Sequence, residues 1–190
     1  FQLSNENGEI LAKTKQLQEL QQILKSEVSL ALIRATPEYM WLHASAAACD
    51  NAAFLLTGVS GKGKSTLVTS LCEVGWKFLS DDMLPFDATS SSVLPFPALA
   101  MRRVPNESRE FLPPDRFDEL KRVFVEMEEG MIQDGAARVS GLIIPEYDPE
   151  GTNELEIARG YSAAADLLEG CINFIEHDQA AIRSLCELIE

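Results

Sequence analysis

The spacing of hydrophobic positions near the start of the chain predicts a long amphipathic helix. Between residues 12 and 34, apolar side chains recur at three- and four-residue steps, with Lys, Gln and Glu between them. Thr36-Pro37 would end this helix, because the residue before a proline is pushed out of helical geometry. The helix would either dock on the core or stand exposed as a partner-binding element. Its periodic apolar positions are Leu17, Leu20, Leu24, Val28 and Ala31.

Two short apolar runs, at residues 41–49 and 52–57, predict a β-hairpin. The Asp50-Asn51 pair between them suits the positive φ angles of a tight turn. The second run leads into a glycine-rich segment and then into a helical stretch at residues 66–74, which Gly75 ends. A strand at residues 76–79 would return beside the first strand of the hairpin. The pattern therefore predicts strand, glycine loop, helix and strand in this order.

The second half of the chain has a less regular pattern. Residues 85–114 contain six prolines and a serine-rich run, which predicts loops around one strand at residues 99–104. Ser162 and Asp178 are expected to cap the last two helices. No repeat or internal boundary is visible, so we expect one α/β domain over residues 1–190, a mixed sheet flanked by helices. The remaining expected elements are a helix at 116–125, strands at 139–144 and 154–158, and helices at 163–174 and 179–189.

The composition adds a strong acidic bias. The 190 residues include 30 Asp and Glu against 16 Lys and Arg, which gives a net charge of -14 and a pI near 4.5. A chain of this length buries enough surface to fold without a disulfide or a metal staple. Its charge opposes binding to a nucleic-acid backbone or to an anionic membrane surface, so we expect neither as a partner.

Targeting signals and cysteine usage favour the cytoplasm. No run approaches the roughly eighteen apolar residues of a membrane span, and residues 1–9 lack the features of a secretory signal. Because the chain opens with Phe rather than Met, we expect further sequence before it. The four cysteines form no C-x-x-C pair and lie in or beside apolar segments, which favours reduced thiols, with disulfides as the alternative.

Residues 58–65 match the phosphate-binding (Walker A) pattern G-x-x-x-x-G-K-[ST], between an expected strand and an expected helix. The glycines would let backbone N–H groups converge on phosphate oxygens, Lys64 would bridge the outer phosphates, and the Ser65 hydroxyl would reach Mg²⁺. A chance match to four fixed positions has a probability of roughly one in 150 in a chain this long. The predicted nucleotide-binding residues are Gly58, Ser60, Gly61, Lys62, Gly63, Lys64, Ser65 and Thr66.

Two adjacent carboxylates follow the glycine loop at a short interval. Asp81 and Asp82 come sixteen and seventeen residues after Ser65, which leaves room for one helix and one adjacent strand. At a strand end, one of two neighbouring side chains can meet a metal ion while the other faces an acceptor. We expect Asp82 to join Ser65 in binding Mg²⁺ and Asp81 to act as the general base. The alternative is that residues 80–82 begin a solvated turn.

Three basic residues are further candidates, and a fourth is not. His43 lies on the first hairpin strand, fifteen residues before Gly58, where a histidine is either a core residue or part of a site. Arg102 and Arg103 follow the proline-rich stretch and would stabilise charge on a transferring phosphate, or would form a surface arginine pair. His177 precedes a helix cap among acidic residues, so we expect it to be structural.

The motifs of several nucleotide-binding classes are missing. The sequence has no NKxD element, no LSGGQ-like signature and no HRD or DFG motif, which disfavours GTPases, transporter ATPases and eukaryotic-type protein kinases. It does contain Leu42-His43-Ala44-Ser45, a hairpin, the glycine loop, a helix and Ser80-Asp81-Asp82. Over residues 41–82 this combination resembles the catalytic domain of HPr kinase/phosphorylase and its relatives.

The resemblance implies a fold related to phosphoenolpyruvate carboxykinase, Mg²⁺-ATP as phosphoryl donor and a serine hydroxyl as acceptor. It also implies that His43 lies close to the catalytic aspartate and tunes it. The chain departs from the bifunctional enzyme after Asp82, because residues 94–103 replace a glutamate-containing Arg-Gly signature that is linked to the phosphorylase activity. Residues 155–160 resemble that signature but come far too late. This favours relatives that phosphorylate other targets, such as lasso peptides.

The sequence thus predicts a cytoplasmic, ATP-dependent kinase that acts on a serine of a protein or peptide. The expected catalytic residues are Asp81, His43 and Lys64, with Arg102 and Arg103 as candidates. A nucleotide-sensing module without turnover and a kinase of small hydroxyl compounds are the alternatives. Self-association and the identity of the acceptor stay open.

Overall fold

The chain divides into two compact units, residues 1–37 and residues 38–190. The structure, a computed structural model, describes residues 1–96, 100–104, 121–148, 151, 154–156 and 162–188. Both units combine helices with strands, and the second contains the segments that the sequence singles out for chemistry.

The first unit consists of a β-ribbon and one helix. Strands β1 (Gln2–Ser4) and β2 (Ile10–Lys13) pair antiparallel, and the Asn5 side chain closes their turn by accepting hydrogen bonds from the backbone N–H groups of Asn7 and Glu9. Helix α1 (Leu17–Ala35) ends at Thr36 as expected. Its predicted start at residue 12 was wrong, because residues 12 and 13 pair with β1.

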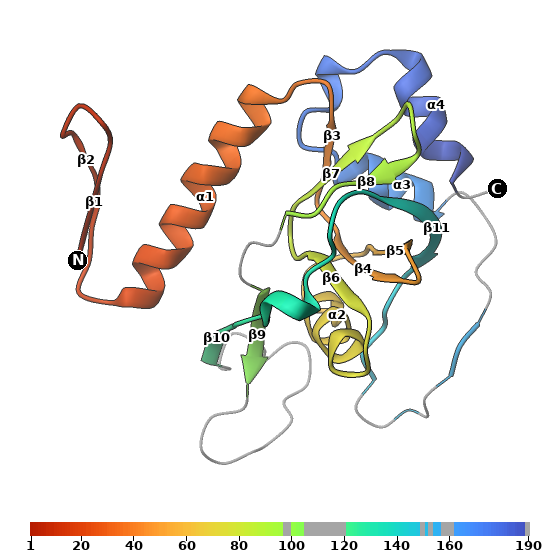
Figure 1. The fold of residues 1–190 in the computed structure, drawn as a ribbon, viewed down its shortest axis with the longest axis horizontal. Helices are drawn as coiled ribbons and strands as arrows, with labels where there is room; N and C mark the ends of the chain where they lie inside the picture. The colour runs from red at the N-terminus through yellow and green to blue at the C-terminus, as the bar shows by residue number, and fades with distance from the viewer. Residues whose placement is uncertain (97–99, 105–120, 149–150, 152–153, 157–161, 189–190) are drawn as a thin grey trace. The chain divides into compact units, whose positions relative to one another are not determined.

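The second unit is built on a mixed sheet whose strand order is β3-β7-β8-β11-β5-β4-β6 (Figure 1). Strands β5 and β11 run parallel, and the other neighbours in this sheet pair antiparallel. A mixed α/β architecture with helices against the sheet agrees with the expected fold class. The strands are β3 (Met40–Leu42), β4 (Ser45–Cys49), β5 (Ala52–Leu56), β6 (Lys77–Ser80), β7 (Leu84–Asp87), β8 (Ser92–Val93) and β11 (Ala137–Ile143).

The predicted hairpin turn and the helix after it are confirmed, but the predicted first strand, residues 41–49, was wrong as one element, because β3 pairs with β7 and only β4 pairs with β5. Strands β4 and β5 pair through a turn in which Asp50 and Asn51 have φ angles of 49° and 66°. Helix α2 (Lys64–Glu73) follows the glycine loop, and Gly75 has a φ of 102°, as expected for a glycine that ends a helix. Strand β6 then pairs with β4, the first strand of the hairpin.

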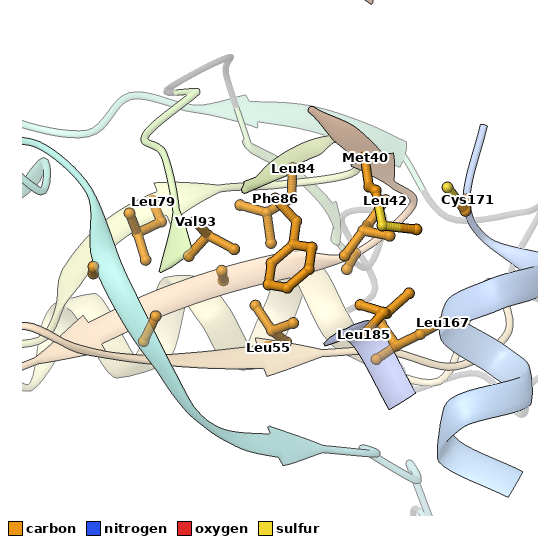
Figure 2. Packing of buried hydrophobic residues seen from close by; sticks show 14 of the residues in the cluster. Met40, Leu42, Leu55, Leu79, Leu84, Phe86, Val93, Leu167, Cys171 and Leu185 are labelled. Carbon is orange, nitrogen blue, oxygen red and sulfur yellow. The ribbon is translucent and has the colours of Figure 1, made fainter. Parts of the chain in front are cut away.

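Alternate residues of the sheet feed two hydrophobic clusters on its opposite faces. Leu55 and Leu79 belong to one cluster, which Figure 2 shows with side chains of α3 (Ser162–Glu169) and α4 (Gln179–Glu187). Leu56 and Phe78, their neighbours in sequence, belong to the other cluster with α2. The sheet is therefore covered by α2 on one face and by α3 and α4 on the other.

Part of the predicted proline-rich loop is in fact a hairpin of β7 and β8. Pro85 lies inside β7, opposite Trp41 of the neighbouring strand β3. The backbone N–H of Trp41 donates to Asn173 and its carbonyl accepts from the N–H of Ile172, so Trp41 needs no bond from Pro85. The Pro85 carbonyl instead accepts from the Leu94 N–H on the side of β8, so the missing N–H removes one donor on that side only.

Three other predicted elements were wrong or too long. Residues 121–125 of the predicted helix form β10 (Lys121–Val125), which pairs with β9 (Ala100–Val104); residues 116–120 lie outside the described residues. Of the predicted strand at 154–158, residues 154–156 are not in a strand, with Leu155 94% exposed, and residues 157 and 158 lie outside the described residues. Helix α3 ends at Glu169, and 3-10 turns η2 and η3 occupy Glu129–Met131 and Phe174–Glu176.

Helix α4 begins as predicted, with the Asp178 carboxylate accepting hydrogen bonds from the N–H groups of Ala180 and Ala181. Ser162, the other predicted cap, is the first residue of α3. All four cysteines are free, and burial raises the pKa of the Cys72 and Cys171 thiols to about 11 each. Among the described residues, no helix has the length and apolar character needed to span a membrane.

A buried amide clamps the segment after α3 to strand β3. The Asn173 side chain, 4% exposed, accepts from the Trp41 N–H at 2.9 Å and donates to the Tyr39 carbonyl at 2.9 Å. Asn173→Ala should lower the free energy of unfolding by about 2 kcal/mol, because it removes both hydrogen bonds of this buried amide, from the Trp41 N–H and to the Tyr39 carbonyl. Urea denaturation measures this loss. Gln133→Ala is the control, since it removes only a surface amide contact to Asn51; an equal loss in both variants would contradict the clamp.

Candidate active site

The loop between β5 and α2 bends at three glycines. Gly58, Gly61 and Gly63 have φ angles of 116°, 92° and 102°, a region that side chains other than glycine rarely adopt. Gly63 is the N-cap of α2, and no side-chain hydrogen bond caps the N-terminus of this helix. The first turn of α2 contains no acidic residue. The helix N-terminus therefore presents backbone N–H groups and a positive dipole end, which suit an anion.

Lys64 is folded back into this loop. Its ammonium donates to the Gly58 carbonyl at 2.5 Å and lies 3.4 Å from the Val59 carbonyl, and the residue is 6% exposed. Burial lowers the pKa of Lys64, and the charges of Asp82, Asp81 and Asp166 oppose that shift. A buried cation whose neighbours include loop carbonyls is poorly solvated, so a phosphate oxygen would be a stronger partner than either carbonyl.

Asp81 lies at the centre of the polar contacts beside the loop. It follows strand β6 and is fully buried. Its Oδ1 accepts from the Ser45 hydroxyl at 2.6 Å and from the Ser65 hydroxyl at 3.0 Å. Its Oδ2 accepts from the backbone N–H of Met101 at 3.1 Å. The sheet, helix α2 and strand β9 therefore all contribute to holding this one carboxylate.

Asp82 is placed differently from its neighbour. It is only partly buried and has a φ of 76°, which is uncommon outside glycine, although Asp tolerates it better than most residues. The Ser80 hydroxyl, which can donate its one hydrogen to either, lies within hydrogen-bond distance of the carbonyls of Met83 and Phe96 and so supports the turn. Asp82 has the largest electrostatic effect of any carboxylate on Lys64. The two aspartates thus differ in exposure, with Asp82 the one that is partly accessible to solvent.

The oxygen atoms beside the loop fit a magnesium ion. The Ser65 hydroxyl and the Asp81 carboxylate, 3.0 Å apart, are the hard oxygen donors that Mg²⁺ prefers. Within the described residues, no group of three or more His, Cys, Asp or Glu side chains could hold a metal. Mg²⁺ at a nucleotide site commonly uses one or two protein carboxylates and completes its shell with phosphates and water. The residues present are compatible with that mode of binding.

The Arg102 side chain reaches the end of α2 that is far from the glycine loop, although the backbone of its neighbour Met101 contacts Asp81. The Arg102 guanidinium lies 3.2 Å from the Glu73 carboxylate, at the last residue of α2. Lys64 is the first residue of this helix, so at 1.5 Å per residue the two ends are about 13 Å apart. An arginine-finger role for Arg102 therefore gains no support from this geometry. The side chain of Arg103 lies outside the described residues.

His43 does not lie on the first hairpin strand, as predicted, but in the turn between β3 and β4, two residues before Ser45. Its backbone N–H donates to the Gly170 carbonyl at 2.7 Å, just after α3, and its side chain is exposed. The predicted action of His43 on the catalytic aspartate stays a prediction. Two of the predicted nucleotide-binding residues are also exposed, Ser60 in the loop and Thr66 in the first turn of α2.

Three residues near the loop were missed by the sequence analysis. Ser45 was part of a quoted motif but received no role. Asp166 of α3 acts electrostatically on Lys64, and no local pattern marks it. Glu146 follows β11, and its carboxylate lies 2.6 Å from the Lys62 ammonium. Because β11 runs parallel to β5, their carboxyl ends lie at the same edge of the sheet, and only this long-range pairing reveals Glu146.

Comparison with known proteins finds no matching family model, no matching curated protein and no matching solved structure.

Proposed function

We propose that this protein is a Mg²⁺-ATP-dependent kinase that transfers the γ-phosphoryl group to a hydroxyl, that of a serine in a protein or peptide. The observation that carries the proposal is the hydrogen bond between the buried Asp81 and Ser65. Ser65 lies in the first turn of α2, directly after the glycine loop and next to Lys64 in the sequence. A phosphate-binding loop with an adjacent acidic strand end is the arrangement that phosphoryl transfer needs. The resemblance to HPr-kinase-like proteins agrees with this choice.

The residues of the loop would bind the phosphates of ATP. The backbone N–H groups of Gly61, Gly63 and the N-terminus of α2 would donate hydrogen bonds to phosphate oxygens. The Lys64 ammonium would leave the loop carbonyls and bind the outer phosphates instead. Ser65 and Asp81 would hold Mg²⁺, which when bound neutralises phosphate charge. In this assignment catalysis comes mainly from positioning and charge neutralisation.

The burial of the two aspartates favours a division of labour opposite to the sequence-based expectation. Asp81 is fully buried and already accepts from Ser45, Ser65 and Met101, so an acceptor hydroxyl has little access to it. Asp82 is more accessible. We therefore assign the metal to Asp81 and the general base to Asp82. The acceptor hydroxyl would lose its proton to Asp82 as the hydroxyl oxygen forms a bond to the γ-phosphorus. The bond from the γ-phosphorus to the β–γ bridging oxygen would break, and that oxygen would leave with ADP.

The finer fold assignment is part of the same proposal. The order hairpin, glycine loop, α2, β6 and Asp81-Asp82 supports a P-loop-containing sheet of the phosphoenolpyruvate carboxykinase type. The parallel pair of β5 and β11 adds support, because ligands of α/β sheets bind beyond the carboxyl ends of parallel strands.

ADP release from Mg²⁺-ATP, measured with and without acceptors, tests the class of substrate. A pool of serine-containing peptides and a separate pool of small hydroxyl compounds should be compared. Stimulation by the peptides supports a protein or peptide kinase, and stimulation by the small compounds alone would replace that acceptor. No turnover with either pool, despite tight ATP binding, would favour a nucleotide-sensing module.

Breaking the ion pair between Lys62 and Glu146 should have only small effects on stability and on ATP affinity. Both side chains are well exposed, so Glu146→Gln should change the free energy of unfolding by less than about 1 kcal/mol. The variant should bind ATP about two- to fivefold more tightly at low salt, because Lys62 loses a competing carboxylate. Titration at two salt concentrations measures this. Glu128→Gln, a substitution of an exposed glutamate outside this ion pair, is the control; equal gains in both variants would point to net charge alone.

A further inference from the structure

Ser45 is a buried hydroxyl whose position is set by the sheet. It is the first residue of β4 and is fully buried. Ala46 and Ala48 belong to the cluster on the α3 and α4 face, whereas Ala47 belongs to the cluster with α2. By strand alternation Ser45 therefore faces α2, the side from which Ser65 approaches Asp81.

The hydroxyls of Ser45 and Ser65 meet on the same oxygen of Asp81. The Ser45 bond is the shorter of the two, 2.6 Å against 3.0 Å. Ser65 belongs to a helix that would bind nucleotide, whereas Ser45 belongs to a strand paired on both sides, with β5 and β6. Ser45 is thus the more rigid anchor for the oxygen that faces Ser65.

We propose that Ser45 is a positioning residue that holds Asp81 in the orientation in which its carboxylate and the Ser65 hydroxyl bind Mg²⁺. This inference rests on the proposed function, because it assumes that the site binds a Mg²⁺-nucleotide. Partners of a metal ligand fix its orientation, and their loss commonly weakens metal binding about 10- to 100-fold. Without the Ser45 hydroxyl, Oδ2 of Asp81 still accepts from the Met101 N–H, but Oδ1 loses the hydrogen bond from strand β4.

Ser80 provides a matched control for the stability cost of losing a buried hydroxyl. It is fully buried and lies on β6, the strand next to β4. Its hydroxyl lies within hydrogen-bond distance of the backbone carbonyls of Met83 and Phe96, to one of which it donates, and not of Asp81. Ser80→Ala and Ser45→Ala therefore make the same chemical change at equal burial, but only Ser45→Ala removes a bond to the proposed metal ligand.

The test is the affinity for a fluorescent ADP analogue, measured with EDTA and with Mg²⁺. Ser45→Ala should bind the analogue within about twofold of wild type in EDTA, and the gain in affinity on adding Mg²⁺ should fall by about tenfold. Ser80→Ala should lose a similar amount of thermal stability and keep the Mg²⁺ gain. If Ser45→Ala fails to fold, Ser45→Cys keeps most of the volume with a weak donor and should show the same loss.

The outcomes separate this inference from the proposed function. A wild-type Mg²⁺ gain that Ser45→Ala retains in full would overturn the positioning role and leave the nucleotide site standing. Equal losses in Ser45→Ala and Ser80→Ala would reduce Ser45 to a structural residue. A wild-type protein that binds no nucleotide in either condition would overturn both proposals.

Discussion

Lys64→Ala is expected to weaken ATP binding by about 100-fold while leaving the fold intact. Each hydrogen bond from a charged group contributes about 1.5–3 kcal/mol, and Lys64 would make such bonds to the outer phosphates. In the structure this ammonium is buried against the carbonyls of Gly58 and Val59, and burial lowers its pKa. Removing it relieves a desolvation cost, so thermal stability should change little. Calorimetric titration with ATP and a melting curve measure the two effects.

Lys62→Ala is the matched control for this prediction. Lys62 lies on the same loop and carries the same charge, but its side chain is 41% exposed and paired with Glu146. Its loss should weaken ATP binding less than about fivefold, since exposed ion pairs contribute little. Equal effects of the two substitutions would show that the loop attracts nucleotide by net charge only and would remove the special role of Lys64.

Substituting the two aspartates separately should produce two different defects. Asp82→Asn is expected to bind Mg²⁺-ATP as tightly as wild type and to lose about 10²- to 10⁴-fold in kcat, the usual contribution of a general base. Asp81→Asn should instead reduce the Mg²⁺ gain in nucleotide affinity, because it removes the carboxylate charge next to Ser65. Equilibrium binding and steady-state kinetics on both variants measure these effects.

The opposite pattern would restore the division of labour expected from the sequence. If Asp81→Asn binds Mg²⁺-ATP normally and fails in turnover, Asp81 is the base despite its burial. If Asp82→Asn retains full turnover, Asp82 has no role in proton transfer. Melting curves on both variants distinguish these results from unfolding.

Elements with strong local signals were predictable from the sequence. The turn at Asp50-Asn51 needs positive φ, and these residue types tolerate it. The glycine loop is likewise encoded locally, by glycines at the positions where φ is positive. Helix α2 and strand β6 were predicted correctly because both are short and Gly75, which lies between them, marks where the helix ends and the strand follows.

Features that depend on long-range pairing were not predictable. Residues 121–125 form a strand because β9 pairs with them, which overrides any helical tendency of the segment. Strand β7 was missed because it contains Pro85, and a proline argues against a strand. It fits here because the backbone of Trp41, on the neighbouring strand, bonds to Asn173 and Ile172 instead of to Pro85. The contact of Ser45 with Asp81 joins residues 36 positions apart, and Glu146 reaches the loop only through β11. No local pattern encodes such contacts.

Transfer of label from γ-³²P-ATP to a mixture of serine-containing peptides tests the central claim most directly. We expect label on serine that requires Mg²⁺ and is absent with Asp82→Asn and strongly reduced with Lys64→Ala. ATP that binds tightly to wild-type protein, but leaves no label on any acceptor, peptide or small hydroxyl compound, would contradict the kinase assignment.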